Sequence, residues 1–316
     1  MIQRLTLASL CLTALACSPE AVSPSLESSD ASLSDAGSLD AADAVAVDAG
    51  PPPEFLGGDR RVAVRLPDTW NRQERWPLVL LLHGYTANGQ GQDVYLGISA
   101  RRNTYGYVTL APDGTRDPRN NRFWNATSTC CDFWRARVDD LGYLRDLIAE
   151  AVEKLSVDPE RVYLVGHSNG GFMSSRIACD AADEVTAVLN IAGSGFVDDQ
   201  RCQPSRAVGY IQVHGTMDTV IRYPGGRLQS GGAYPGAETL VERWRARNGC
   251  SGPAEQQPAD DFDRAVLGAE TTRSIWSDCS GGRSVELWTM EGSAHVPGFT
   301  DAFRDAMIET LLSYGR

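Results

Sequence analysis

The sequence predicts an α/β fold in which a mostly parallel sheet is covered by helices on both faces. Short apolar runs alternate along the chain with segments of helical periodicity, as they do where crossover helices join parallel strands. The apolar runs are continuous, which is typical of strands buried on both faces. About 260 of the 316 residues follow the N-terminal region, enough for one large domain with a sizeable core.

The predicted elements follow these runs in chain order. An edge-like strand is expected at 61–66, and further strands are expected at 78–82, 107–110, 161–165, 185–191, 208–213 and 285–289. Leucine-class residues recur on one helical face over 141–155, and the last helix carries an apolar stripe over 303–314. Residues 113–137 lack a clear period, and long loops of this kind are usually functional. The stretch 194–206 is too short to hold a large cap domain.

Residues 1–16 have the composition of a secretory signal peptide. A basic residue precedes an apolar run that is too short to span a bilayer and that ends in small residues. Two processing routes stay open. Ala14-Leu15-Ala16 suits ordinary signal peptidase, whereas Leu15-Ala16-Cys17 resembles a bacterial lipobox, in which Cys17 becomes a lipidated N-terminus. We favour lipidation of Cys17, although alanine stands where a lipobox usually has leucine.

Residues 17–54 are rich in Ser, Ala, Asp and Pro, and contain eight acidic residues and no basic one. Such a segment buries too little apolar surface to offset the entropy of ordering, so we expect a disordered tether. It accounts for most of the net charge of −12 and leaves the folded domain, expected over 55–316, close to balanced. We therefore expect no nucleic-acid partner, an extracellular or outer-surface location, and membrane contact only through the lipid.

The chain contains a G-x-S-x-G motif, Gly166-His167-Ser168-Asn169-Gly170, directly after an apolar strand and directly before a helix. This context predicts a nucleophile elbow, in which a sharp turn exposes the serine hydroxyl. Glycine on either side of Ser168 removes the Cβ atoms that would crowd such a turn. The helix that begins at Asn169 directs free N–H groups toward the serine. The alternative is a glycine-rich strand–helix turn with an incidental serine.

The four histidines stand at or just beyond the ends of predicted strands, the edge where ligands bind in open α/β sheets. His295, on the loop after the last strand, is the predicted general base. His83 begins a turn that matches an oxyanion-hole segment, in which the backbone N–H of Tyr85 would donate. His167 is expected to be structural, with its side chain pointing away from the pocket. His214 is expected to brace the turn that follows it.

The third member of a triad should lie between the serine and the histidine in sequence. Asp218 directly follows the strand predicted at 208–213. Its competitors, Asp198 and Asp199, lie in a polar stretch that has the composition of a solvated loop. We therefore assign the acid to Asp218.

These assignments predict acyl transfer. Ser168 would attack an acyl carbon while His295 takes its proton, and Asp218 would fix the histidine tautomer and stabilise the imidazolium. The backbone N–H groups of Asn169 and Tyr85 would hold the oxyanion.

Seven motifs occur in an order that is specific in combination: Leu82-His83-Gly84-Tyr85, Ala111-Pro112-Asp113-Gly114-Thr115, Phe123-Trp124-Asn125-Ala126, Cys130-Cys131-Asp132, Val138-Asp139-Asp140-Leu141, Gly166-His167-Ser168-Asn169-Gly170-Gly171 and His214-Gly215-Thr216-Met217-Asp218. Over 62–314 the chain resembles secreted bacterial esterases of the polyhydroxybutyrate depolymerase-like or feruloyl esterase-like group in the α/β-hydrolase superfamily. The resemblance implies an α/β-hydrolase fold and a serine carboxylic-ester hydrolase for bulky or polymeric esters, such as feruloylated plant polysaccharide or polyhydroxyalkanoate.

One motif departs from that family. The family often has Gly-Gly-Gly-His before Trp-Pro-Gly, whereas this chain has Gly292-Ser293-Ala294-His295-Val296-Pro297-Gly298. The missing tryptophan would line the acyl site, so the family's substrate preference does not carry over.

Six cysteines remain beyond Cys17, and an even number in an exported protein favours disulfides. The resemblance implies the pairs Cys179–Cys202 and Cys250–Cys279. The other two, Cys130 and Cys131, would then form a vicinal disulfide or remain as two thiols.

Two tryptophans of the long loop, Trp124 and Trp134, are candidate substrate contacts that could stack a phenolic or polymer acyl group. The alternative is that they belong to the core. The sequence has no motif for a metal, a nucleotide or a flavin, so we expect no cofactor. We also expect a monomer, with an ester substrate as its partner. Two other functions stay open: a serine peptidase of prolyl-oligopeptidase type, and a catalytically silent surface-binding protein on a hydrolase scaffold.

Overall fold

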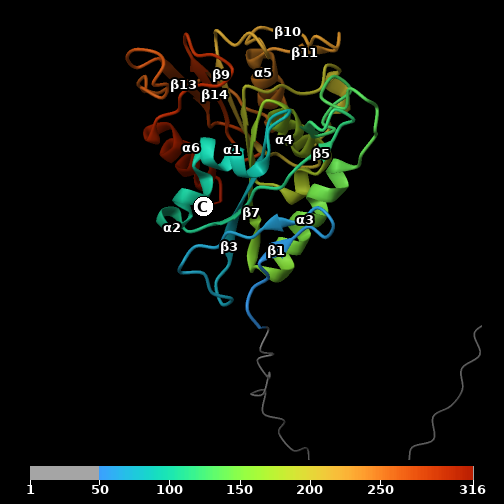
Figure 1. Cartoon of the computed structure of the whole chain (residues 1–316). Coiled ribbons are helices and arrows are strands. Elements are labelled where there is room, and N and C mark those ends of the chain that lie inside the picture. Colours follow the sequence, from blue (N-terminus) through green and yellow to red (C-terminus); the bar gives the residue numbers. More distant parts are fainter. Residues whose placement is uncertain (1–49, 316) are drawn as a thin grey trace, which may run out of the picture. The chain divides into compact units, whose positions relative to one another are not determined.

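An eight-stranded sheet runs through residues 50–315, the part of the chain that the computed structural model describes (Figure 1). In order across the sheet, its strands are β12 (Glu255–Gln256), β13 (Thr271–Trp276), β14 (Val285–Met290), β9 (Gly209–Gly215), β8 (Ala187–Ile191), β7 (Val157–His167), β3 (Trp76–Leu82) and β4 (Val108–Leu110). All neighbours from β14 to β4 are parallel, and β12 and β13 add an antiparallel edge. The prediction of a mostly parallel sheet is confirmed.

Helices cover both faces of this sheet. They are α1 (Gly89–Leu96), α2 (Ile98–Tyr105), α3 (Asp140–Lys154), α4 (Asn169–Asp180), α5 (Ala237–Asn248) and α6 (Asp301–Ser313). Figure 1 shows α1, α2 and α6 on one side of the sheet and α3 and α4 on the other. Alternate residues of β3 face the two layers: Leu80 and Leu82 belong to the apolar cluster of α3, α4 and α5, whereas Val79 and Leu81 belong to that of α1, α2 and α6. Burial on both faces explains why the strands are continuous apolar runs.

Smaller elements surround the sheet. The antiparallel pairs are β1 (Phe55–Leu56) with β2 (Val62–Ala63), β5 (Thr115–Arg116) with β6 (Arg122–Phe123), and β10 (Gly225–Arg227) with β11 (Ala233–Pro235). The short helices η1 (Ala182–Glu184) and η2 (Asp199–Arg201) complete the fold. The edge strand predicted at 61–66 is reduced to β2 and one bridge from Arg65 to Thr109 of β4. Between β8 and β9 the chain holds only η2, so no large cap domain is inserted there.

Residues 1–49 and residue 316 lie outside the described structure, and so do the predicted signal peptide, Cys17 and most of the predicted tether. Residues 50–54, predicted as its end, are described: Glu54 O accepts a hydrogen bond from Val64 N at 2.9 Å. Among the described helices, none has the length and apolar character needed to cross a bilayer.

Within residues 50–315, three disulfides are present. Cys179, in the last turn of α4, is bonded to Cys202, just after η2, and Cys250 is bonded to Cys279. These are the pairs that the resemblance implies. Their partners are 23 and 29 residues apart in sequence, so the chain-entropy model gives each a stabilisation of about 3–4 kcal/mol. The remaining pair, Cys130 and Cys131, is joined as a vicinal disulfide.

Candidate active site

The turn between β7 and α4 holds Ser168 in a strained backbone conformation, with φ at +56° and ψ at −116°. A residue other than glycine adopts such angles only where the surrounding structure enforces them. The N–H of Ser168 is fixed by Ile191 O at 2.8 Å. A Cβ atom at position 166 would lie 2.1 Å from the carbonyl oxygen of Gly170. The close contact of the strand end with the helix start therefore requires glycine, as the motif predicts.

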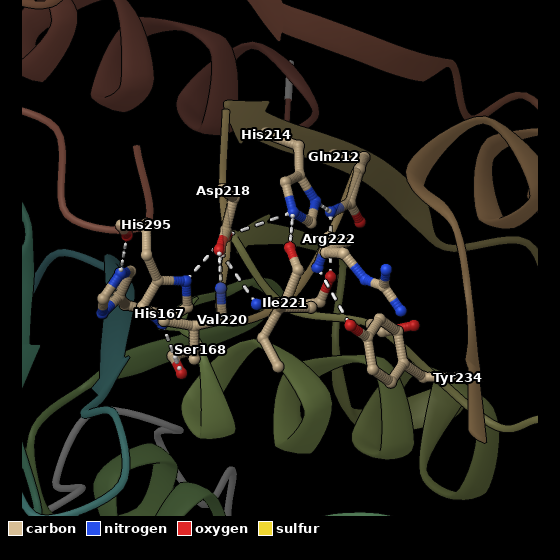
Figure 2. A network of polar contacts seen from close by, with 12 residues as sticks. His167, Ser168, Gln212, His214, Asp218, Val220, Ile221, Arg222, Tyr234 and His295 are labelled. Carbon is tan, nitrogen blue, oxygen red and sulfur yellow. Dashed lines mark hydrogen bonds and ion pairs between the residues drawn. The ribbon is translucent and has the colours of Figure 1, made fainter. Parts of the chain in front are cut away.

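Three side chains from the ends of different strands meet at this turn (Figure 2). Ser168 Oγ lies 3.0 Å from His295 Nε2, and His295 Nδ1 lies 2.7 Å from Asp218 Oδ2. With the Nδ1 hydrogen donated to Asp218, Nε2 is free to accept the serine proton. The arrangement can therefore perform nucleophilic catalysis with a histidine as general base.

Asp218 is only 3% exposed, and both of its oxygens accept hydrogen bonds. Oδ1 accepts from the backbone N–H groups of Val220 at 2.8 Å and Ile221 at 2.9 Å. Burial by itself would raise the pKa of Asp218, but hydrogen bonds from His214 and His295 outweigh it and hold that pKa well below its usual range. The carboxylate is thus ionised at neutral pH and can stabilise a positively charged His295.

His214 lies on the other side of Asp218 from His295 (Figure 2). Its Nε2 lies 2.6 Å from Ile221 O and 3.4 Å from Asp218 Oδ2, while its Nδ1 lies 3.1 Å from Gln212 Nε2. Because the Gln212 amide donates to Nδ1, the hydrogen resides on Nε2 and points at the turn. His214 braces this turn, as expected from the sequence.

The two competing acids have other partners. Asp199 forms ion pairs with Arg243, at 3.3 Å, and with Arg247. Asp198 accepts a hydrogen bond from Gln200 N at 3.0 Å at the start of η2. Of the three candidates, the structure places Asp218 beside His295.

His83 fixes the turn that contains the second predicted oxyanion donor. Its side chain is fully buried, with Nδ1 2.7 Å from Gly84 O and Nε2 accepting from Gly114 N at 2.8 Å. Burial lowers the pKa of His83 to about 4, so the ring is neutral near pH 7. It therefore ties the turn to residues 113–137. The N–H of Tyr85 belongs to this turn, and Asn169 is the first residue of α4, where backbone N–H groups have no intrahelical partner.

A cavity of about 300 Å³ opens over Ser168, and Tyr85, Tyr95 and His167 contribute to its wall. The expectation that His167 points away from the pocket is wrong. In β7 its side chain is on the same face as Val165, toward α1, where the cavity lies. His167 is structural nonetheless, since its Nε2 lies 2.9 Å from the carbonyl oxygen of His295. A larger cavity of about 640 Å³ along α3 contains none of these groups.

The two tryptophans proposed as substrate contacts differ in exposure. Trp124 is completely buried, donates its Nε1 hydrogen to His83 O at 3.1 Å, and donates its backbone N–H to Asn169 Oδ1 at 2.7 Å. That position agrees with the core alternative, because substrate cannot contact a ring beneath the turn. Trp134 is 45% exposed and donates its Nε1 hydrogen to Asp117 Oδ2 at 3.2 Å.

Asp117 is one of three acids in the loop 113–137 and is not a site residue predicted from the sequence, because its link to the turn of Tyr85 exists only in the folded chain. Among the described residues, no group of three His, Cys, Asp or Glu side chains is placed to hold a metal ion.

Comparison with known proteins adds to this geometry. The model of the Alpha/beta hydrolase family matches residues 79–309. Feruloyl esterase B of Piromyces equi is 28% identical over 247 residues, which cover 76% of this chain and 43% of that protein. Feruloyl esterase D of Neurospora crassa is 27% identical over 257 residues, which cover 78% of this chain and 77% of that protein.

The fold is shared with a solved structure of an acetyl xylan esterase from Aspergillus awamori. Its TM-score is 0.59 at 14% sequence identity, and the match covers 84% of this chain and 100% of that one. The chain spans less than half the length of the Piromyces protein. The family model nevertheless matches most of the length of this chain. The chain therefore belongs to the alpha/beta hydrolase family.

Proposed function

We propose that the protein is a serine carboxylic-ester hydrolase. The observation that carries the proposal is the contact of Ser168 with His295, and of His295 with Asp218, at a strained strand–helix turn. The names of its relatives, two feruloyl esterases among them, support ester hydrolysis within the wider family.

The proposed reaction proceeds through an acyl-enzyme. Ser168 Oγ attacks the acyl carbon while its proton passes to His295 Nε2, and the oxyanion is held by the N–H groups of Tyr85 and Asn169. Each such donor contributes on the order of 3 kcal/mol to the transition state. His295 then gives the proton to the leaving alcohol oxygen as the ester bond breaks. Water, deprotonated by His295, attacks the acyl-enzyme and releases the acid and Ser168.

The proposed substrates are bulky or polymeric esters, with feruloyl esters of plant polysaccharide favoured over polyhydroxyalkanoate. The relatives' names support the first class. The proposed location is outside the cytoplasm, which three disulfides in the described domain support, because disulfides persist in oxidising compartments.

The proposal is tested with a fluorophosphonate probe and a substrate panel. The panel holds methyl ferulate, p-nitrophenyl esters of increasing chain length, 3-hydroxybutyrate oligomers and peptide amides. We expect labelling of Ser168, none in Ser168→Ala, and turnover of esters. Turnover of peptide amides alone would indicate a peptidase, and an unlabelled Ser168 would indicate a catalytically silent protein.

A further inference from the structure

The loop 113–137 contains a buried carboxylate that the proposed mechanism does not use. Asp117 is 6% exposed, and its two oxygens accept five hydrogen bonds. Oδ1 accepts from the backbone N–H groups of Arg119 at 2.8 Å and Asn121 at 2.9 Å. Throughout residues 50–315, no lysine or arginine forms an ion pair with it. Because a buried carboxylate needs these hydrogen bonds, it strongly restricts the positions of the neutral groups that donate them.

The other oxygen of Asp117 joins two distant segments. Oδ2 accepts from Tyr85 Oη at 2.6 Å, from Trp134 Nε1 at 3.2 Å and from Asn121 Nδ2 at 3.2 Å. Tyr85 belongs to the turn that carries the proposed oxyanion donor, whereas Trp134 lies in the long loop. One carboxylate oxygen therefore links the turn beside Ser168 to an exposed part of the loop.

Two aromatic side chains of the loop are connected to the cavity through Tyr85, Phe133 by a ring contact and Trp134 through Asp117. Tyr85 lines the cavity over Ser168. The ring of Phe133 meets the ring of Tyr85 nearly edge-on, with centroids 5.4 Å apart and planes at 76°. Next to it, Trp134 has the guanidinium of Arg119 5.2 Å from its ring centroid.

Two of these rings remain exposed although they are held in place. Phe133 is 40% exposed and Trp134 is 45% exposed. Large apolar side chains that are exposed, adjacent and fixed beside a cavity are typical of binding surfaces. One face of Trp134 carries Arg119, so the exposed parts of the two rings are left to pack on a ring of the substrate. An ester can present such a ring as an aromatic group or as the C–H face of a pyranose.

We propose that Phe133 and Trp134 are specificity-determining residues, forming a subsite for a ring of the ester that extends beyond the cavity over Ser168. Asp117 is the positioning residue that holds this subsite against Tyr85. The inference rests on the proposed esterase function and names which part of the substrate the loop contacts.

The test compares ring-bearing esters with a small ester that fits the cavity. Wild-type protein, Phe133→Ala and Trp134→Ala are assayed with methyl ferulate, an acetylated xylo-oligosaccharide and methyl butyrate. We expect the ratio of kcat/KM for a ring-bearing ester to that for methyl butyrate to fall about three- to tenfold for each lost ring, through KM. Phe55→Ala is the matched control: Phe55 is 43% exposed but packs on Arg61 near β2, so this ratio should not change.

The two ring-bearing esters distinguish the source of the ring. A change confined to methyl ferulate assigns the subsite to the aromatic acyl group, and a change confined to the oligosaccharide assigns it to the sugar. Equal changes for all three esters, or none, would overturn the inference while leaving the esterase function intact.

The positioning role of Asp117 is tested by Asp117→Asn. An amide in place of the carboxylate directs its own N–H groups at donors, so we expect the ring selectivity to fall as it does in Trp134→Ala, with a lower kcat as well. If Asp117→Asn does not fold, Trp134→Phe serves instead, because it keeps a ring but loses the donor to Asp117; a smaller loss of selectivity than in Trp134→Ala is expected. Wild-type selectivity in a folded Asp117→Asn protein would contradict this role.

A binding measurement separates this inference from the failure of the proposed function. Calorimetry with ferulate and with xylo-oligosaccharide is done on Ser168→Ala and on Ser168→Ala combined with Trp134→Ala. At least one ligand should bind about three- to tenfold more weakly to the double variant. If the single and the double variant bind ferulate with the same affinity, and also bind xylo-oligosaccharide with the same affinity, the subsite is contradicted even if no ester is ever turned over.

Discussion

His167 Nε2 lies 2.9 Å from the carbonyl oxygen of His295, so the residue before the nucleophile supports the backbone of the predicted general base. The two rings are 5.1 Å apart. Burial lowers the pKa of His167 to about 4, so the ring is neutral near pH 7 and its Nε2 hydrogen is available for that carbonyl. The contact links the end of β7 to the loop after β14, two segments that must keep a fixed distance for proton transfer.

The contact predicts a positioning effect on catalysis. His167→Ala removes the donor, and we expect kcat to fall about tenfold, the equivalent of one hydrogen bond of about 1.4 kcal/mol. His167→Gln can restore an N–H donor and should recover part of the loss. Steady-state kinetics with the best ester of the panel would measure both. A kcat in His167→Ala equal to that of wild type would show that the loop of His295 holds its position alone.

The triad predicts larger effects. Ser168→Ala and His295→Ala should each lower kcat by several orders of magnitude, about 10⁴-fold or more, with the circular dichroism spectrum unchanged. Asp218→Asn should cost somewhat less, because it leaves the base in place with the wrong tautomer. Asp199→Asn is the matched control, since Asp199 pairs with Arg243 and Arg247. Loss of activity in Asp199→Asn, with Asp218→Asn active, would reverse the assignment of the acid.

Two buried histidines predict acid sensitivity of the fold. The pKa values of His83 and His167 are both lowered by burial, from 6.5 to about 4. Between these pH values the unfolded chain binds protons that the folded protein does not, so the free energy of unfolding decreases as the pH falls from 6.5 to 4. Each histidine contributes up to about 3 kcal/mol over this range.

Urea unfolding at pH 7, 6, 5 and 4.5 measures this effect. His167→Gln should remove the contribution of one histidine and so flatten the dependence. A free energy of unfolding that stays constant from pH 7 to 4.5 would mean that these rings become charged in the folded state.

The parts of the fold that local sequence pattern determines could be predicted. The apolar run 161–165 and the glycines on either side of Ser168 are sufficient to predict the strand–turn–helix unit. The reason is local, because the backbone there leaves no space for a Cβ atom at position 166. By contrast, β13 was not predicted. It lies between β12 and β14, next to the edge of the sheet, and its residues beyond Thr271 are only partly buried or exposed, so it shows no apolar run. Helix α1 was not predicted either, because Gly89 and Gly91 lower the helix propensity of this segment.

Other features depend on contacts between distant segments. The depth of Trp124 is set by the turn of His83 and by Asn169, which lie far from it in sequence. Nothing in the sequence distinguishes Asp117 from Asp113 and Asp132 of the same loop, and only the fold brings Tyr85 to it. The direction of His167 could have been predicted from strand alternation, because Val165 is buried on the same face.

Cys17 stands at the end of the apolar run of the predicted signal peptide. Lipidation at this cysteine would hold the protein at a membrane surface through its acyl chains. Cys17→Ala keeps the Ala14-Leu15-Ala16 site for ordinary signal peptidase, so the protein should still be exported. We expect the variant in the soluble fraction with wild-type kcat, since Cys17 precedes the described domain. Fractionation and mass spectrometry of the N-terminus would measure this. A wild-type protein that is already soluble, with an unmodified N-terminal cysteine, would rule out the anchor and leave only secretion.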